Sequence, residues 1–217
     1  MDGDQMNYIE IIDAAKAYTD RYDEELAGNM TAFTRVVEAK INNSLRTGEQ
    51  SVRSQIWLQK EQEFYSLPSD WGGAREVEIL NEGEQYGQTL TYLAPEELNK
   101  ISRQNTSAAN FHNNYYTIIA GQIRIAPPAD YQTLEIVYYQ RLPPLSDDTD
   151  SNWLTNKNPD AYIFGLCCEI SAFAKDSALF DAYKARFAEA LMDITQEDQI
   201  TRWSGPALRV QVEGLVV

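Results

Sequence analysis

The 217-residue sequence is long enough for one domain, or for a small body with one insertion, and its 43% hydrophobic content can supply a core. A formal net charge of -15 argues against a module that binds nucleic acid through its whole surface, because such binding needs clustered Lys and Arg on the phosphates. Two adjacent cysteines cannot build a disulfide framework, and no run approaches the ~18 apolar residues of a membrane span. We therefore expect a soluble protein, intracellular when made.

Residues 1–49 are predicted to form an N-terminal helical pair. From about Met6 to Tyr18, apolar residues recur on one helical face. A second helix can be capped by Asn29 or Thr31, and Gly48 stands where a glycine after the helix end is expected. Its apolar stripe contains Phe33, Val36, Val37, Ile41 and Leu45.

Residues 50–145 are predicted to form an antiparallel β insert. Short strands are expected around Ile56, Phe64 and Val77, and the segments 115–120 and 122–126 predict a hairpin that turns at Gly121. Further elements are a strand at 89–93, a short helix from Pro95 and a final strand at 134–140. The prolines of Leu142-Pro143-Pro144-Leu145 must end that last strand, because neither can donate a ladder hydrogen bond.

Residues 146–198 are predicted to contain a C-terminal helical pair. The first helix opens at Asn158-Pro159-Asp160, with Pro159 near the first helical position, and the second follows a break at 175–177. The short connection makes the two helices antiparallel neighbours. The predicted fold class is α+β: a four-helix body of two N-terminal and two C-terminal helices, an antiparallel β-sheet insert between them, and an extended C-terminal tail.

That tail covers residues 199–217. Its apolar residues are Trp203, Leu208, Val210, Val212, Leu215, Val216 and Val217. A segment this apolar should bury itself, either as an edge strand of its own sheet or by insertion into a partner subunit. Strand addition to a partner would provide main-chain hydrogen bonds for affinity and alternating pockets for specificity.

The sequence carries little that predicts an enzyme. Its single histidine, His112, lies in a polar loop without a GxSxG-like elbow, and one His with two adjacent Cys cannot form a zinc site. The acidic run at 147–150 lacks the glycine and closing glutamate of an EF-hand loop. Neither catalytic residues nor a cofactor or metal site are predicted.

One stretch resembles a known family. A strand ending in "YYQRLPPLSD", a polar bridge containing "NWL" and a helix opening "NPDAYIFGLCCEISAFAKD" are similar to the head–tail adaptor proteins of short-tailed bacteriophages, where the pattern is "LPxLSD", "NWLL", then "PDxYLYGALLEAA". The residues that match are Leu142, Pro143, Leu145, Ser146, Asp147, Trp153, Leu154, Pro159 and Tyr162. The similarity is good from Leu134 to about Ile194. Cys167-Cys168 replaces small apolar residues, and "TNKN" replaces a more apolar run.

The resemblance implies a structural virion protein of the neck between head and tail, with no enzymatic activity. Copies, twelve in such adaptors, would form a ring beneath the portal protein, dock on it through their C-terminal tails, and carry the tail nozzle and in some relatives tail fibres. Genomic DNA would pass through the channel without sequence-specific binding, which suits an acidic wall. No membrane is involved.

Two other functions remain open at this stage. A carbohydrate-binding β module of a virion or cell surface could stack sugar rings on Tyr115-Tyr116 and Tyr138-Tyr139, although strand tyrosines more commonly pack in a core. An acid-pair glycoside hydrolase would need two carboxylates about 5–10 Å apart in a cleft.

Overall fold

The computed structural model describes residues 6–81, 87–105, 113–129, 132–146 and 150–203. Within these ranges the chain contains six α-helices and two four-stranded sheets, which confirms the mixed α+β class. The chain forms two compact units. We call Met1–Glu49 together with Leu142–Val217 the helical unit, and Gln50–Arg141 the β unit.

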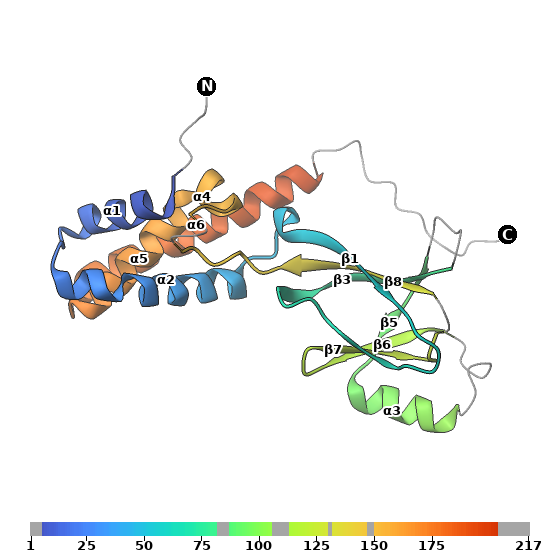
Figure 1. The fold of residues 1–217 in the computed structure, drawn as a ribbon. Coiled ribbons are helices and arrows are strands. Elements are labelled where there is room, and N and C mark those ends of the chain that lie inside the picture. The colour runs from blue at the N-terminus through green and yellow to red at the C-terminus, as the bar shows by residue number, and fades with distance from the viewer. Residues whose placement is uncertain (1–5, 82–86, 106–112, 130–131, 147–149, 204–217) are drawn as a thin grey trace. The chain divides into compact units, whose positions relative to one another are not determined.

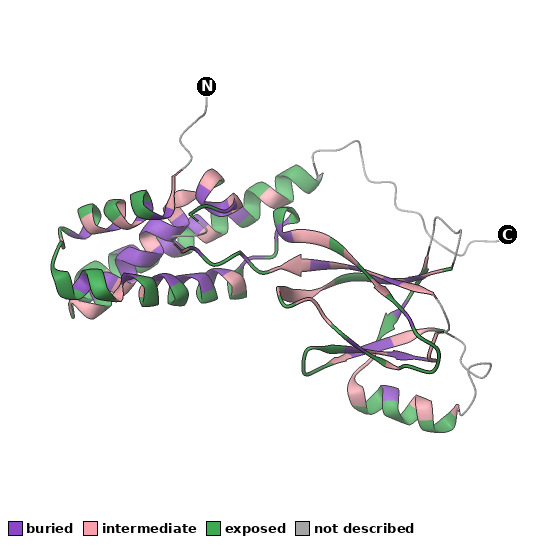
Figure 2. Ribbon diagram, in the orientation of Figure 1, coloured by how far each residue is buried: buried purple, intermediate pink, exposed green. Residues whose placement is uncertain are grey.

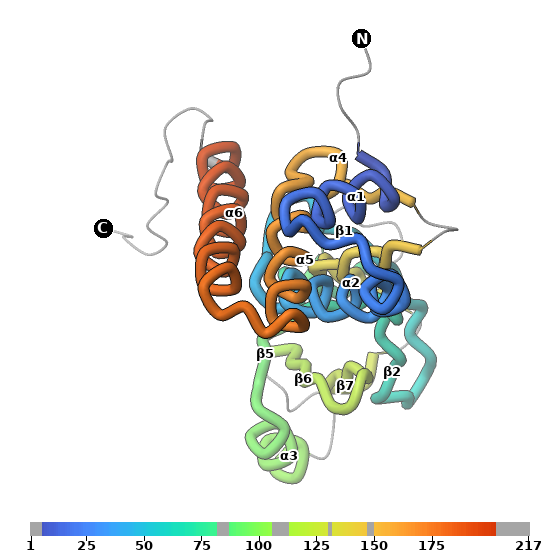
Figure 3. Tube along the Cα trace, turned by 90° about the vertical axis from the view of Figure 1, so that its left-hand side faces the viewer, coloured from blue at the N-terminus to red at the C-terminus, as the bar shows by residue number. Residues whose placement is uncertain are grey.

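The helical unit is arranged around one central helix. Its helices are α1 (Tyr8–Thr19), α2 (Glu24–Ser44), α4 (Trp153–Lys157), α5 (Pro159–Phe173) and α6 (Ser177–Trp203). Helix α5 contacts the other four, and the end-on view in Figure 3 shows it between α6 on one side and α1 and α2 on the other. Figure 2 shows α5 largely buried, whereas α1, α2 and α6 each expose one face. The core of this unit is therefore formed by the N-terminal helices together with the C-terminal helices.

The helix starts are set by side-chain caps. Asn7 and Glu10 form a reciprocal capping box at α1, and Asp23 accepts a hydrogen bond from the Leu26 amide at the start of α2. The prediction that Asn29 or Thr31 caps the second helix is thus wrong. Leu26 and Met30 already belong to the buried stripe of α2, so the helix begins well before the predicted caps, with Asp23 as its N-cap.

The end of α2 also differs from the prediction. The helix finishes at Ser44 with Leu45 in an extended conformation, and Gly48 lies beyond it in the short 3₁₀-helix η1 (Gly48–Gln50). Val36, expected in the apolar stripe, is 42% exposed. The stripe faces α5 through Val37 and Ile41 instead.

Two features of the C-terminal part depart from the sequence analysis. The polar bridge contains an extra short helix, α4, and helix α6 continues to Trp203, although the extended tail was expected from residue 199. Helix α5 starts at Pro159 as predicted. Most residues of α5 are buried, and both Cys167 and Cys168 are among them.

The β unit contains two sheets rather than one insert sheet. The strands are β1 (Ser51–Trp57), β2 (Phe64–Ser66), β3 (Trp71–Leu80), β4 (Gln88–Thr89), β5 (Thr91–Tyr92), β6 (Tyr115–Ile119), β7 (Gln122–Ala126) and β8 (Thr133–Gln140), and the helix is α3 (Pro95–Gln104). One sheet has the order β1-β8-β3-β4 and the other β2-β7-β6-β5 (Figure 1). The prediction of a purely antiparallel insert is wrong at β5, which pairs parallel to β6.

A single apolar core lies between these two sheets. Leu134 and Ile136 from β8 share it with Ile123 and Ile125 from β7. These residues alternate with more exposed neighbours along each strand, as expected for sheets with one buried face. The predicted hairpin is present, and Gly121 takes a positive φ of 78° at its turn.

Candidate functional site

The sequence singled out residues 142–162, here called the motif segment, of which 147–149 lie outside the described residues. The chain leaves β8, passes Leu142-Pro143-Pro144-Leu145 and reaches α4 and α5. Only Leu142 and Leu145 in that first stretch have a backbone N–H to satisfy, because proline has none. Buried donors of this kind need an acceptor.

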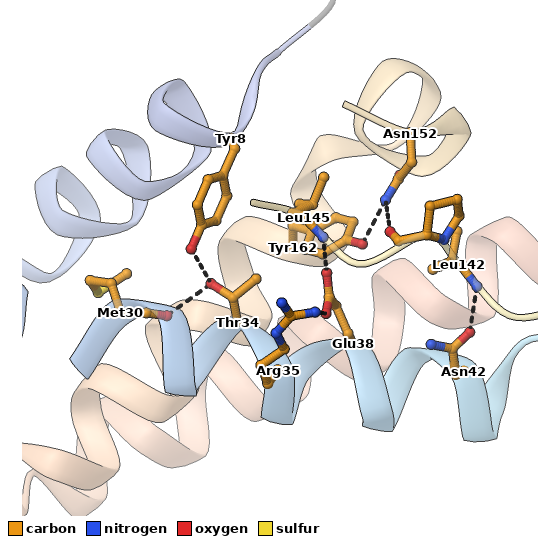
Figure 4. A network of polar contacts seen from close by, with 11 residues as sticks. Tyr8, Met30, Thr34, Arg35, Glu38, Asn42, Leu142, Leu145, Asn152 and Tyr162 are labelled. Carbon is orange, nitrogen blue, oxygen red and sulfur yellow. Dashed lines mark hydrogen bonds and ion pairs between the residues drawn. The ribbon is translucent and has the colours of Figure 1, made fainter. Parts of the chain in front are cut away.

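Helix α2 supplies both acceptors (Figure 4). Asn42 Oδ1 accepts from Leu142 N at 2.8 Å, and Glu38 Oε1 accepts from Leu145 N at 2.5 Å. The two side chains are four residues apart, so they lie on the same face of α2, one above the other. The motif segment is therefore bound along α2 by its backbone, while the side chains of Leu142 and Leu145 are buried in the core.

Glu38 is the one charged group in this contact and is only 5% exposed. Its other oxygen forms an ion pair with Arg35 at 3.5 Å, one turn earlier on α2. Burial raises the pKa of the Glu38 carboxyl above its usual range, and the hydrogen bond from Leu145 and the Arg35 charge oppose that shift. A hydrogen bond to a charged acceptor of this kind stabilises a fold by about 1.5–3 kcal/mol.

Asn152 connects the two halves of the motif segment. Its Oδ1 accepts from the amides of Leu154 and Thr155 and so caps α4, and Thr155 Oγ1 accepts from the Asn152 amide. Its Nδ2 donates to Pro143 O at 3.3 Å and to Tyr162 Oη at 2.9 Å. Tyr162 is fully buried, and burial raises the pKa of its hydroxyl far above the ordinary value.

A second set of contacts ties α1 to the same region. Tyr8 Oη lies 3.3 Å from Thr34 Oγ1, and Thr34 Oγ1 donates to Met30 O at 2.9 Å (Figure 4). The Tyr8 amide donates to Asp150 O at 2.7 Å. Three segments far apart in sequence thus meet here through satisfied polar groups.

The structure brings most of the matched residues together. Leu142, Leu145, Leu154 and Tyr162 are buried in one core, Trp153 is half-buried against it, and Pro159 occupies the first turn of α5. Ser146 is only partly buried, and Asp147 lies outside the described residues.

Of the predicted tail residues, only Trp203 is described, as the last residue of α6. Leu208, Val210, Val212, Leu215, Val216 and Val217 lie outside the described residues, as does His112.

Sequence reasoning missed the polar residues of α2: Glu38 and Asn42, which bind the motif segment, and Thr34, which contacts Tyr8. Thr34, Glu38 and Asn42 recur every four residues on α2, and the first two are among the buried polar side chains. Polar residues at helical spacing inside an apolar stripe are the signal that could have identified them, because buried polar groups need partners. The motif segment, 100 residues or more away, could not be recognised as that partner.

Two of the four tyrosines considered for sugar stacking are buried in the core of the β unit. Tyr138 is 4% exposed, stacks on Trp71 at a centroid distance of 5.2 Å and donates to Asp70 at 2.9 Å. Burial and the Asp70 carboxylate raise the pKa of Tyr138 to about 12. Tyr116 is also buried. Two of the four rings are therefore unavailable as a binding platform.

The described residues contain neither a metal-binding cluster nor an activated thiol. No group of three His, Cys, Asp or Glu side chains in the described ranges could hold a metal ion. Burial raises the pKa of the Cys167 thiol to about 12 and that of Cys168 to about 11, so neither is a ready nucleophile. Across the same residues, no helix combines the length and apolar character needed to cross a membrane.

Comparison with known proteins gives one family. The sequence model of the family described as SU10 adaptor protein matches residues 6–210, which include the whole β unit, most of the helical unit and the whole motif segment. A search of the curated proteins found no match.

Proposed function

We propose, from the premise that this chain belongs to the SU10 adaptor protein family of structural bacteriophage proteins, that its copies form a ring beneath the portal and link the capsid to the tail nozzle. In this role the protein is a virion component that works by docking and not by turnover. Its partners are the portal protein, neighbouring copies of itself (twelve in the full ring), the nozzle, and tail fibres where present.

The contact between α2 and the motif segment supports this role most directly. A ring subunit must transmit mechanical force between its partners without changing shape. Its core should therefore be stabilised by interactions that do not depend on a ligand. Glu38 and Asn42 bind the two backbone amides of Leu142–Leu145, and Asn152 caps α4 and donates to Tyr162. The family match includes all of these positions.

The charge of the chain fits a DNA channel. With 33 acidic and 18 basic residues, a repeated ring would carry a strongly negative wall. Such a wall repels the phosphate backbone, so DNA would slide past it without sequence-specific binding.

The portal-docking element is the apolar segment that follows α6. Its alternating residues 208, 210 and 212 suit strand addition to a partner, with apolar side chains on one face. We expect the chain alone to be monomeric or weakly associated, and the ring to close when the portal binds this segment.

Mass photometry of the purified chain, alone and mixed with the portal ring from the same genome, tests the proposal. The expected result is a shift from monomer to a portal carrying about twelve adaptor copies, the number that the proposed ring requires. A chain that stays monomeric beside the portal would contradict the adaptor role and would favour the carbohydrate-binding module, which a glycan array would then examine.

A substitution pair tests the docking element itself. Replacing Leu208, Val210 and Val212 by Ser should abolish portal binding, because the apolar face is lost. The matched control replaces the interleaved Arg209, Gln211 and Glu213 by Ser and should still bind. Equal binding by both variants, or unimpaired binding after truncation at Gly205, would refute docking through this segment.

A further inference from the structure

A cleft of about 320 Å³ lies where the residues after α2, the helix α4 and the last turns of α6 meet. Its apolar surface comes from Trp153 and Ile194, and its rim carries Glu49, Lys157, Asp198 and Arg202. All of these residues belong to the helical unit. The size falls at the lower end of the range for sites that bind small ligands or single side chains.

Hydrogen bonds and ion pairs hold the walls of this cleft in place. Asp198 accepts from the Gly48 amide at 2.6 Å and pairs with Arg202 at 2.8 Å. Arg202 also donates to Arg46 O at 3.3 Å, which ties α6 to the residues after α2. Lys157 of α4 forms an ion pair with Glu49. The cleft is therefore formed before any occupant enters.

Trp153 lines the cleft from the first turn of α4, and hydrogen bonds of Asn152 hold this turn in place. Helix α4 has only five residues, but Asn152 caps it and is in turn bonded to Pro143 and Tyr162. The indole is half-buried, and Ile194 beside it is 4% exposed. A fixed aromatic ring next to a buried aliphatic residue favours a partner with an apolar side chain.

We propose that this cleft receives the side chain of Leu208 from the same chain, packed against Trp153. Thr201 and Arg202 line the cleft, so the chain leaves α6 at its rim. The sequence continues Ser204-Gly205-Pro206, residue types that end helices and favour a reversal, and then alternates apolar and polar residues through Val212. The segment that we assign to the portal is thus held on its own subunit until the portal competes for it.

Length and charge are consistent with this occupant. Six residues after Arg202 span up to ~20 Å when extended, whereas the last two turns of α6 cover only ~11 Å, so Leu208 can fold back to the cleft. The cleft lining contains three carboxylates (Glu49, Glu197 and Asp198) and two basic side chains (Lys157 and Arg202). Its net charge is therefore negative, which favours the approach of Arg209. The tether raises the effective concentration of the segment to the order of millimolar.

Disulfide trapping in the full-length chain tests the inference. Glu197 lines the cleft, so the double variant Glu197→Cys with Leu208→Cys should cross-link rapidly within one chain under mild oxidation. The matched control, Gln196→Cys with Leu208→Cys, places the thiol on the neighbouring exposed position of α6. The native thiols do not interfere, because Cys167 and Cys168 are buried.

We expect the Glu197 pair to close at least roughly tenfold faster than the control pair, as for a tethered segment with a defined site. Adding Trp153→Ala should reduce that advantage, while circular dichroism verifies that this variant is folded. Equal rates for the two pairs would overturn the inference. Disulfide-linked dimers whose formation scales with concentration would also overturn it, since the cleft would then take the segment of a second copy. The test uses the chain alone, so its failure leaves the portal assay to be judged separately.

Discussion

Substituting Gly165 by Ala tests how closely three helices approach in the helical unit. A Cβ atom at this position of α5 would lie 2.6 Å from Val37 Cγ1 of α2 and 3.2 Å from Phe187 Cε2 of α6. Carbon atoms in contact prefer about 3.5–4.0 Å, so the added methyl overlaps its neighbours by roughly 1 Å. Val37 is fully buried, so it has little room to move.

The magnitude follows from two opposing effects. Alanine improves helix propensity over glycine by about 1 kcal/mol, whereas overpacking a close-packed core costs about 1–3 kcal/mol. We expect a net loss of roughly 1 kcal/mol in the free energy of unfolding. Urea unfolding followed by far-ultraviolet circular dichroism measures it, because most of the helix lies in this unit.

Gly28 provides a matched control within the same unit. It lies in α2, and a Cβ there would meet nothing within 4 Å. Gly28→Ala should therefore stabilise the protein by about 0.5–1 kcal/mol through propensity alone. Combining Gly165→Ala with Val37→Ala should recover part of the loss, with a coupling energy of about 1 kcal/mol in a double-mutant cycle. Equal stabilisation by both glycine substitutions would refute the close approach of α2, α5 and α6.

Three further predictions concern buried polar and thiol groups. Glu38→Ala should cost about 1–3 kcal/mol in urea unfolding, because the Leu145 amide loses its buried acceptor, whereas Glu38→Gln keeps an acceptor and should cost less. Burial raises the pKa of Glu38, so the contribution of its carboxyl group to the free energy of unfolding is complete below the unfolded-state pKa and is lost as pH rises through the folded-state pKa. The free energy of unfolding of wild type relative to Glu38→Gln should therefore fall across that window. A difference that does not change with pH would contradict the assignment. Cys167 and Cys168 should not react with Ellman's reagent at mildly alkaline pH until the chain is unfolded, because burial raises their pKa values to about 12 and 11. Asn152→Ala should cost about 1–2 kcal/mol through the lost cap of α4, with faster amide exchange at residues 153–157 than in wild type as the local readout.

What the sequence by itself determined is mostly local. Pro159 at the start of α5, the hairpin at Gly121 and the strand that ends before Pro143 follow from backbone restrictions of the residues concerned, so the pattern along the chain predicts them. The motif segment was also identified from sequence, and the match to residues 6–210 confirms the family.

Only the tertiary structure decided which segments meet. Glu38 binds an amide 107 positions further along the chain and Asn42 one 100 positions away, and no local pattern encodes either pairing. The parallel pairing of β5 with β6 is different, because the helix expected from Pro95 between these two strands is the kind of connection that parallel strands require. Local propensities limit the conformation of each segment, but burial of apolar faces and the need to satisfy buried polar groups select their partners, and both depend on residues remote in sequence.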